Sequence, residues 1–174
     1  MQTLGFFTPS PWPSRGFTLV EMLVCLGVLG VMASLAIPGW QRLQERHRIE
    51  AARDQLVSDL QAARIRALQR GEALQLMRLQ NCTWGTSIST DWSCGWQLVV
   101  KADQTVLQST PQLTPLQITF AKTDPLDVST RGDLGTVGDR WVIKSRQAAF
   151  NISNVLCLSS AGRLRWQAGD TCSH

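Results

Sequence analysis

The chain has few of the groups from which catalytic and metal sites are built. Its 174 residues include only two histidines, His47 and His174, and neither has a nucleophile and an orienting acid in motif spacing. The HExxH, P-loop and G-x-S-x-G motifs are absent, and no CxxC pair of cysteines occurs. The sequence therefore predicts no enzyme, no zinc site and no cofactor.

Charge is also scarce near the N-terminus. Residues 1–16 carry one charged residue, Arg15, and residues 17–37 carry one, Glu21, in a largely apolar run. At 1.5 Å per residue this run forms a helix of about 30 Å, which matches the thickness of a bilayer core. A carboxylate costs about 2.5–3.5 kcal/mol at the centre of a membrane helix and less near its end, so we expect Glu21 to have a neutralising partner.

A secretory signal peptide and a plain membrane anchor are the ordinary explanations of such a run. A signal peptide has a shorter apolar segment, and its cleavage site follows that segment. No small-residue cleavage site follows this run, which favours a segment that stays in the mature protein. Arg15 favours a cytoplasmic N-terminus, with the rest of the chain outside the inner membrane.

The segment from Arg15 to Glu21, with the apolar run behind it, resembles the processing site of type IV prepilins and pseudopilins. The resemblance implies that a prepilin peptidase removes the leader, residues 1–16, by cutting between Gly16 and Phe17, and then methylates the new N-terminal amine. It also implies that Glu21 pairs with the N-terminal amine of a neighbouring subunit. Pro38 matches a position where these proteins commonly carry a helix-kinking proline.

Residues 40–70 contain no proline or glycine, which favours a continuous helix that stops near Gly71. Apolar residues recur there at three- and four-residue steps and form a stripe, whereas arginines such as Arg64 lie off it and are expected to form a solvated face. The stripe consists of Ile49, Ala52, Leu56, Leu60, Ala63 and Ala67. We therefore expect one long helix, with residues 17–39 in the membrane and an amphipathic half, residues 40–70, packed on a globular head.

Residues 71–174 show short apolar or alternating runs between turn residues, which predicts an antiparallel β head in the periplasm. The runs are residues 74–76, 96–100, 106–107, 116–120, 141–143, 150–152, 155–158 and 164–166. Residues 81–95 and 123–139 are expected to be extended loops. The predicted fold class is α+β, in which the long N-terminal helix packs on this head.

Four cysteines fall in the exported part, and they allow three pairings. The pairs Cys82–Cys94 and Cys157–Cys172 are favoured because each closes a short loop, and a loop of roughly fifteen residues contributes about 3 kcal/mol in the chain-entropy model. Free thiols are the alternative. Cys25, inside the apolar run, is expected to be a small lipid-facing or packing residue.

The head resembles the FimT and FimU minor pilins and the H pseudopilin of type II secretion, which share a domain family. The resemblance rests on Asp-Leu-Gln-Ala-Ala-Arg at residues 59–64, on residues 92–96, and on Ser-Ala-Gly-Arg-Leu-Arg at residues 160–165. It implies a non-enzymatic minor pilin that assembles with the major and other minor pilins of a type IV pilus, along the filament or at its tip. A pseudopilin of a type II secretion system stays open as the alternative. The head cysteines and the Gly-Arg-Leu-Arg segment favour the pilus.

The last of these segments is expected to form a hairpin, because residues 155–158 and 164–166 flank a Ser-Ser-Ala-Gly connection. Strand alternation would direct Arg163 and Arg165 outward together, about 7 Å apart, where they could contact successive phosphates. Solubilising an edge strand is the plainer role for such arginines.

FimT proteins use a Gly-Arg-x-Arg motif at this place to bind DNA during natural transformation. The resemblance therefore places the DNA-binding motif at Gly162, Arg163 and Arg165, with DNA contact on the two arginines and Gly162 as the turn residue. Lys144 and Arg146 are candidates to extend the patch, although no family motif supports them. The net charge of +4 at pH 7 is compatible with a polyanionic partner.

Overall fold

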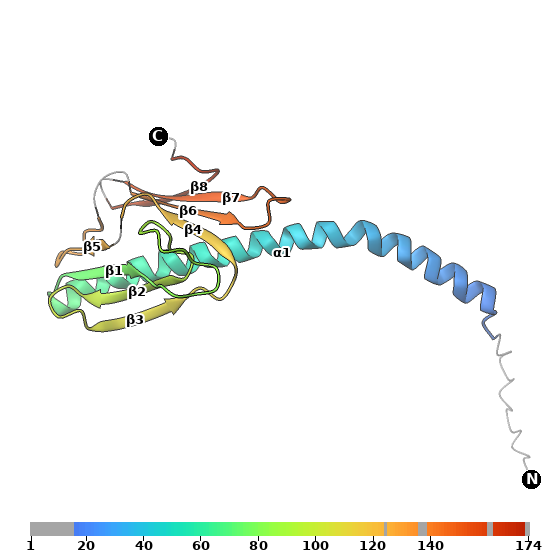
Figure 1. The fold of residues 1–174 in the computed structure, drawn as a ribbon, viewed down its shortest axis with the longest axis horizontal. Helices are drawn as coiled ribbons and strands as arrows, with labels where there is room; N and C mark the ends of the chain where they lie inside the picture. The colour runs from blue at the N-terminus through green and yellow to red at the C-terminus, as the bar shows by residue number, and fades with distance from the viewer. Residues whose placement is uncertain (1–15, 124, 136–138, 160–161, 173–174) are drawn as a thin grey trace, which may run out of the picture. The chain divides into compact units, whose positions relative to one another are not determined.

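The computed structural model describes residues 16–123, 125–135, 139–159 and 162–172 (Figure 1). Arg15 and the rest of the expected leader up to that residue lie outside the described residues, as do Ser160 and Ala161. The chain divides after Trp40 into two compact units. One helix, α1 (Leu19–Arg70), begins in the first unit and ends in the second.

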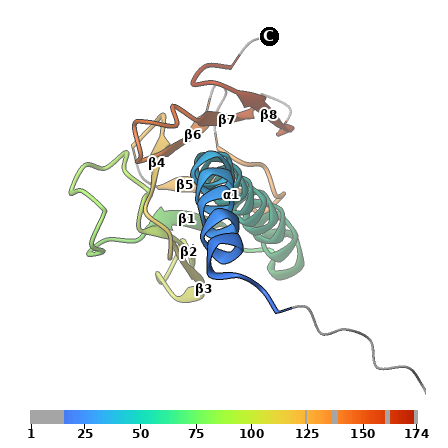
Figure 2. The same cartoon turned by 90° about the vertical axis from the view of Figure 1, so that its right-hand side faces the viewer.

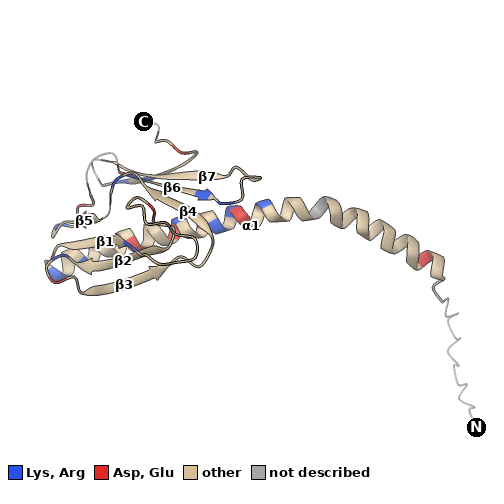
Figure 3. Cartoon of the chain, viewed as in Figure 1, with Lys and Arg blue, Asp and Glu red and all other residues tan. Residues whose placement is uncertain are grey.

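The N-terminal unit consists of the first part of α1, in which Glu21 is the one charged residue up to Trp40 (Figure 3). Thr18 caps the helix, because its Oγ1 accepts a hydrogen bond from the backbone N–H of Glu21 at 3.2 Å. Pro38 lies inside the helix without ending it. Within the described residues, α1 is the one helix long and apolar enough to cross a membrane, and its apolar segment is exposed.

The C-terminal unit contains two four-stranded antiparallel sheets (Figure 1). One sheet, in the order β3-β2-β1-β5, is formed by β1 (Leu74–Arg78), β2 (Gly95–Val100), β3 (Val106–Pro111) and β5 (Leu126–Val128). The other, in the order β4-β6-β7-β8, is formed by β4 (Leu116–Phe120), β6 (Arg140–Ser145), β7 (Ser153–Leu158) and β8 (Leu164–Ala168). The α+β class and the antiparallel head agree with the sequence-based prediction.

A single core joins both sheets to the second half of α1, which lies beside them (Figure 2). The predicted apolar stripe is buried along its whole length, with Ile49, Leu56 and Leu60 at 0% exposure. It packs on inward-facing side chains such as Leu76 of the first sheet and Ile143 of the second. Burial of this stripe explains why the helix continues so far into the head, since an amphipathic helix within a protein draws most of its stability from such packing.

The strand prediction was wrong at two places. The expected loop over residues 123–139 contains β5, a strand of three residues whose Leu126 and Val128 are buried against β1. Residues 150–152, expected as a strand, lie in the turn before β7, where Phe150 N–H donates to the carbonyl of Gln147 at 3.0 Å. Asn151 has a φ of 42°, which is incompatible with an extended strand.

Both favoured disulfides are present. Cys82–Cys94 closes the loop before β2 over a separation of 12 residues, and Cys157–Cys172 joins β7 to the C-terminal tail over 15 residues. The second bond holds the tail against β7 beside β8. Among the described residues, Cys25 is the one free cysteine, and it is exposed on the N-terminal part of α1.

Candidate functional site

The N-terminal candidate site lies at the start of α1. Gly16 and Phe17 precede the helix and are exposed, and Glu21 is exposed in its first turn. Among the described residues, the Glu21 carboxylate makes no hydrogen bond or ion pair with a side chain. Its position leaves it open to a cationic group from outside this chain.

The C-terminal candidate site is the hairpin of β7 and β8. β8 is the edge strand of its sheet, and Arg165 lies opposite Cys157 on β7. Ser159 closes the connection, because its N–H donates to the Arg163 carbonyl at 2.9 Å and its carbonyl accepts from Gly162 N–H at 2.9 Å. Gly162 has a φ of 71°, a left-handed conformation that glycine adopts without steric cost. The predicted hairpin is confirmed.

Alternation along β8 separates two kinds of side chain. Leu164 and Trp166 are partly buried against the core, whereas Arg163 and Arg165 are exposed. The guanidinium of Arg53 on α1 lies over the Trp166 ring, 5.1 Å from its centroid, and so holds the inner face of β8 to the helix. In the part of the chain that the structure describes, the guanidinium groups of Arg163 and Arg165 form no hydrogen bond or ion pair, whereas the backbone N–H of Arg163 donates to Ser159 Oγ at 3.1 Å.

Lys144 and Arg146 lie apart from this pair and are engaged within the head. Lys144 Nζ contacts a carboxylate oxygen of Asp170 at 2.6 Å, and this bond holds the pKa of Asp170 below its ordinary value. Arg146 donates to the backbone carbonyls of Leu116 and Trp84. Lys144 lies opposite Ser153 on β7, four residues from Cys157, or about 13 Å along the strand. The structure therefore does not bring either cation beside Arg165.

Arg64 on α1 reaches the same hairpin from the helix. Its Nε donates to the carbonyl of Gly132 at 2.9 Å, and its Nη1 donates to the carbonyl of Gly162 at 3.0 Å. Helical periodicity predicts a solvated side chain here, but turns from two distant parts of the chain cover it. The only sequence signal for this contact was the place of Arg64 at the end of the Asp-Leu-Gln-Ala-Ala-Arg segment.

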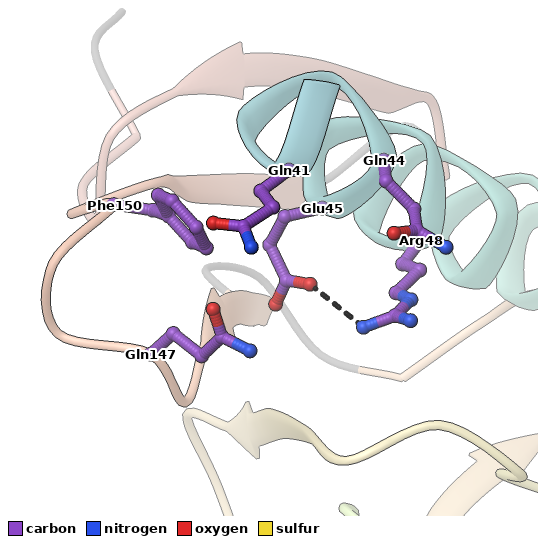
Figure 4. A pocket seen from close by; sticks show the side chains of 6 residues that line it. All are labelled: Gln41, Gln44, Glu45, Arg48, Gln147 and Phe150. Carbon is purple, nitrogen blue, oxygen red and sulfur yellow. Dashed lines mark hydrogen bonds and ion pairs between the residues drawn. The ribbon is translucent and has the colours of Figure 1, made fainter. Parts of the chain in front are cut away.

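A polar cavity of about 190 Å³ lies between α1 and the loop that joins β6 to β7 (Figure 4). It is lined by Gln41, Gln44, Glu45, Arg48, Gln147 and Phe150. Glu45 is 4% exposed and accepts hydrogen bonds from Ser145 Oγ at 2.6 Å and from Arg48 Nη1 at 3.2 Å. Both carboxylate oxygens are thus bound within the head, which indicates a structural role. The described residues contain no cluster of side chains able to hold a metal ion.

Comparison with known proteins relates both ends of the chain to one class of protein. Residues 13–37 match the family model of the prokaryotic N-terminal methylation motif, and residues 52–167 match that of the type II transport protein GspH. The type II secretion system core protein G of Klebsiella pneumoniae is 37% identical over 73 residues. This match covers 42% of the chain and 44% of the relative, so the chain spans less than half the length of that protein.

Two crystal structures of the type IV minor pilin FimU of Pseudomonas aeruginosa share the fold. They have TM-scores of 0.55 and 0.58 at 21% identity, and they cover 71% and 74% of this chain and 99% and 98% of their own. The GspH model matches well over half of the chain. The chain therefore belongs to the GspH family and, with its N-terminal methylation motif, is a minor pilin or pseudopilin of the type IV pilus and type II secretion class.

Proposed function

We propose that this chain is a minor pilin of a type IV pilus that binds DNA through Gly162, Arg163 and Arg165 during natural transformation. The observation that carries the proposal is a pair of exposed arginines, Arg163 directly before the edge strand β8 and Arg165 within it, whose guanidinium groups form no hydrogen bond or ion pair with another described residue. A guanidinium makes bidentate hydrogen bonds with phosphate, so two of them about 7 Å apart can contact neighbouring positions of a nucleic-acid backbone. Such binding reads the backbone and is independent of base sequence.

The N-terminal site supports a route into the filament. A prepilin peptidase cuts after Gly16 and methylates the amine of Phe17, and the apolar part of α1 anchors the chain with its N-terminus on the cytoplasmic side and its head in the periplasm. Glu21 then pairs with the N-terminal amine of a neighbouring pilin. Both charges are costly in lipid, and the pair neutralises them.

A pseudopilin of a type II secretion system is the second candidate. The match to the GspH family model and the identity to core protein G favour it. This candidate uses the same membrane helix and head but gives no role to the exposed Arg163 and Arg165.

A deletion strain separates the two candidates. We expect DNA uptake to fall while secretion through a type II system is unchanged. Intact piliation in that strain would indicate a DNA-receptor role, and lost piliation would indicate a role in assembly. A secretion defect with normal transformation would overturn the pilus assignment.

Binding in vitro tests the DNA contact itself. The full chain, purified in a non-ionic detergent that adds no charge, is titrated onto a labelled DNA duplex at several salt concentrations. The logarithm of the binding constant falls linearly with the logarithm of the salt concentration. The steepness of this line should decrease by about 0.9 for each protein–phosphate contact that a substitution removes. The double variant Arg163→Gln/Arg165→Gln should therefore lower the slope by about 1.8. The matched control is Arg42→Gln/Arg46→Gln, which also removes two exposed charges, but from α1. Equal binding by the double variant and the control would refute DNA contact at β8.

A further inference from the structure

Two turns that lie far apart in the sequence meet on the guanidinium of Arg64. Gly132 belongs to the turn between β5 and β6, and Gly162 belongs to the turn between β7 and β8. Their carbonyl oxygens accept hydrogen bonds from two nitrogens of one guanidinium, at 2.9 and 3.0 Å. The two turns therefore lie side by side over the same point of α1.

Each turn approaches α1 closely at its glycine, so that a side chain there would be tightly placed. A Cβ on Gly132 would lie 3.2 Å from the Arg64 carbonyl oxygen and 3.3 Å from Leu68 Cγ, and one on Gly162 would lie 3.3 Å from Arg64 Nη2. Both glycines have left-handed φ values, 77° and 71°. The backbones of both turns thus rest directly on Arg64, and this shared contact sets where the two turns lie relative to each other.

Each glycine adjoins an exposed arginine. Arg131 directly precedes Gly132, and Arg163 directly follows Gly162, so the contact with Arg64 brings two cations from distant segments to one end of the head. The Arg131 side chain is 87% exposed. Its ion pair with Asp133 is long, at 3.6 Å, and Asp133 is itself 67% exposed, so water screens the pair and an incoming phosphate can displace it.

The turn that carries Arg131 is ordered by its own hydrogen bonds. Ser129 N–H donates to the Asp133 carbonyl at 3.0 Å, and Gly132 N–H donates to the Ser129 carbonyl at 2.8 Å. Ser129 Oγ accepts from the backbone N–H groups of Arg131 and Asp133. Arg131 is therefore presented from a defined backbone, which lowers the entropy lost when its side chain is bound.

We propose that Arg131 joins Arg163 and Arg165 in one surface that binds the phosphate backbone of duplex DNA, with Arg64 as the positioning residue that holds the two turns together. The proposal rests on the proposed function. Duplex DNA carries one negative charge per about 1.7 Å of its axis, a density at which phosphates can contact the guanidinium groups of Arg131, Arg163 and Arg165 at once. The nearby carboxylate of Asp133 opposes this binding, and its displacement is part of the cost.

The test uses the full chain in non-ionic detergent and a labelled DNA duplex, with binding measured by fluorescence anisotropy over a range of salt concentrations. The variants are Arg131→Gln, Arg64→Lys and their combination, with Arg46→Gln as the control for loss of one charge. Arg64→Lys keeps the charge but replaces the planar fork, which bonds two carbonyls, with a single ammonium group. Near-ultraviolet circular dichroism checks that each variant is folded.

We expect Arg131→Gln to weaken binding several-fold and to reduce the salt slope by about 0.9, beyond any effect of the control. In the Arg64→Lys background, Arg131→Gln should reduce the affinity for DNA by a smaller factor, because the two turns are no longer held together. A purely structural role of Arg64 would not produce this coupling between the two substitutions.

Equal DNA affinities and equal salt slopes for Arg131→Gln and Arg46→Gln would overturn the Arg131 contact. In that case, loss of DNA binding in the Arg163→Gln/Arg165→Gln variant would still support the proposed function. An equal cost of Arg131→Gln in both backgrounds overturns the role of Arg64. Tighter binding of polyglutamate than of DNA at the same salt concentration overturns the assignment to a phosphate backbone.

Discussion

The carboxylate of Asp59 on α1 accepts a hydrogen bond from the indole N–H of Trp96 on β2 at 2.8 Å, in a site where Asp59 is 6% exposed and Trp96 is 1% exposed. The same carboxylate accepts three further hydrogen bonds, from Thr110 Oγ1 at 2.8 Å and from the amides of Gln108 and Gln55 at 2.7 and 3.1 Å. Four neutral donors therefore satisfy one buried charge. This arrangement ties the first sheet to the helix.

Replacing Asp59 with asparagine should destabilise the head. Each Asp59 oxygen accepts two hydrogen bonds. In asparagine one of these oxygens becomes an NH₂ group, which cannot accept a hydrogen bond from either of the two donors that point at it. We expect a loss of about 2 kcal/mol or more in the free energy of unfolding. Urea unfolding followed by tryptophan fluorescence measures it.

Asp54→Asn is the matched control for this substitution. Asp54 lies on the same helix, is 67% exposed and, among the described residues, forms an ion pair with Arg53. We expect its replacement to change stability by about 0.5 kcal/mol or less. Similar losses in the two variants would contradict a special role for the buried carboxylate.

Acid should weaken the docking of the C-terminal tail. The hydrogen bond from Lys144 lowers the pKa of Asp170, so the stabilising contribution of Asp170 is complete above its unfolded-state pKa of about 3.9 and is lost as the pH falls through the lower folded value. Asp170→Asn should therefore reduce stability at pH 7 but much less near pH 2. Unfolding curves of both proteins at the two pH values provide the measurement. A difference that persists unchanged in acid would mean that the ion pair is not its source.

Lys144 should contribute little to DNA binding, because its ammonium group is bound by Asp170 and lies about 13 Å along the sheet from the row of Arg165. We expect Lys144→Gln to weaken binding no more than Arg46→Gln does, measured as anisotropy of a labelled duplex. A loss comparable to that of Arg165→Gln would show that Lys144 leaves Asp170 for a phosphate.

Glu21 should matter for assembly and not for processing. Glu21→Gln removes the charge that is proposed to pair with a neighbouring N-terminal amine, but it leaves Gly16 and Phe17 in place. We expect the mass of the Glu21→Gln chain to be that of the cleaved and methylated protein. We also expect much less of this variant than of the unchanged chain in filaments sheared from the cells. Glu72→Gln, a change at an exposed carboxylate in the head, serves as the comparison. Normal incorporation of the Glu21 variant would rule out the pairing.

The helix, its apolar stripe and the β7–β8 hairpin could be predicted because each depends on residues close in sequence. Ile49, Leu56 and Leu60 recur at the helical period, and Arg163 and Arg165 alternate with apolar residues at the strand period. The short loops closed by the cysteines made the two disulfides the favoured choice among three. The strand β5 was missed because three residues carry too short a pattern to stand out from a loop.

The order of residues along the chain is enough to predict a membrane-length helix, the turn chemistry at Gly162 and the faces of β8, since these follow from local periodicity and backbone geometry. It does not indicate which cations are free at the surface. Lys144 is bound by a carboxylate 26 residues away, and Arg64 is covered by turns 68 and 98 residues away. Those partners meet only when the two sheets pack on α1, because contacts between distant segments depend on the packing of the whole head.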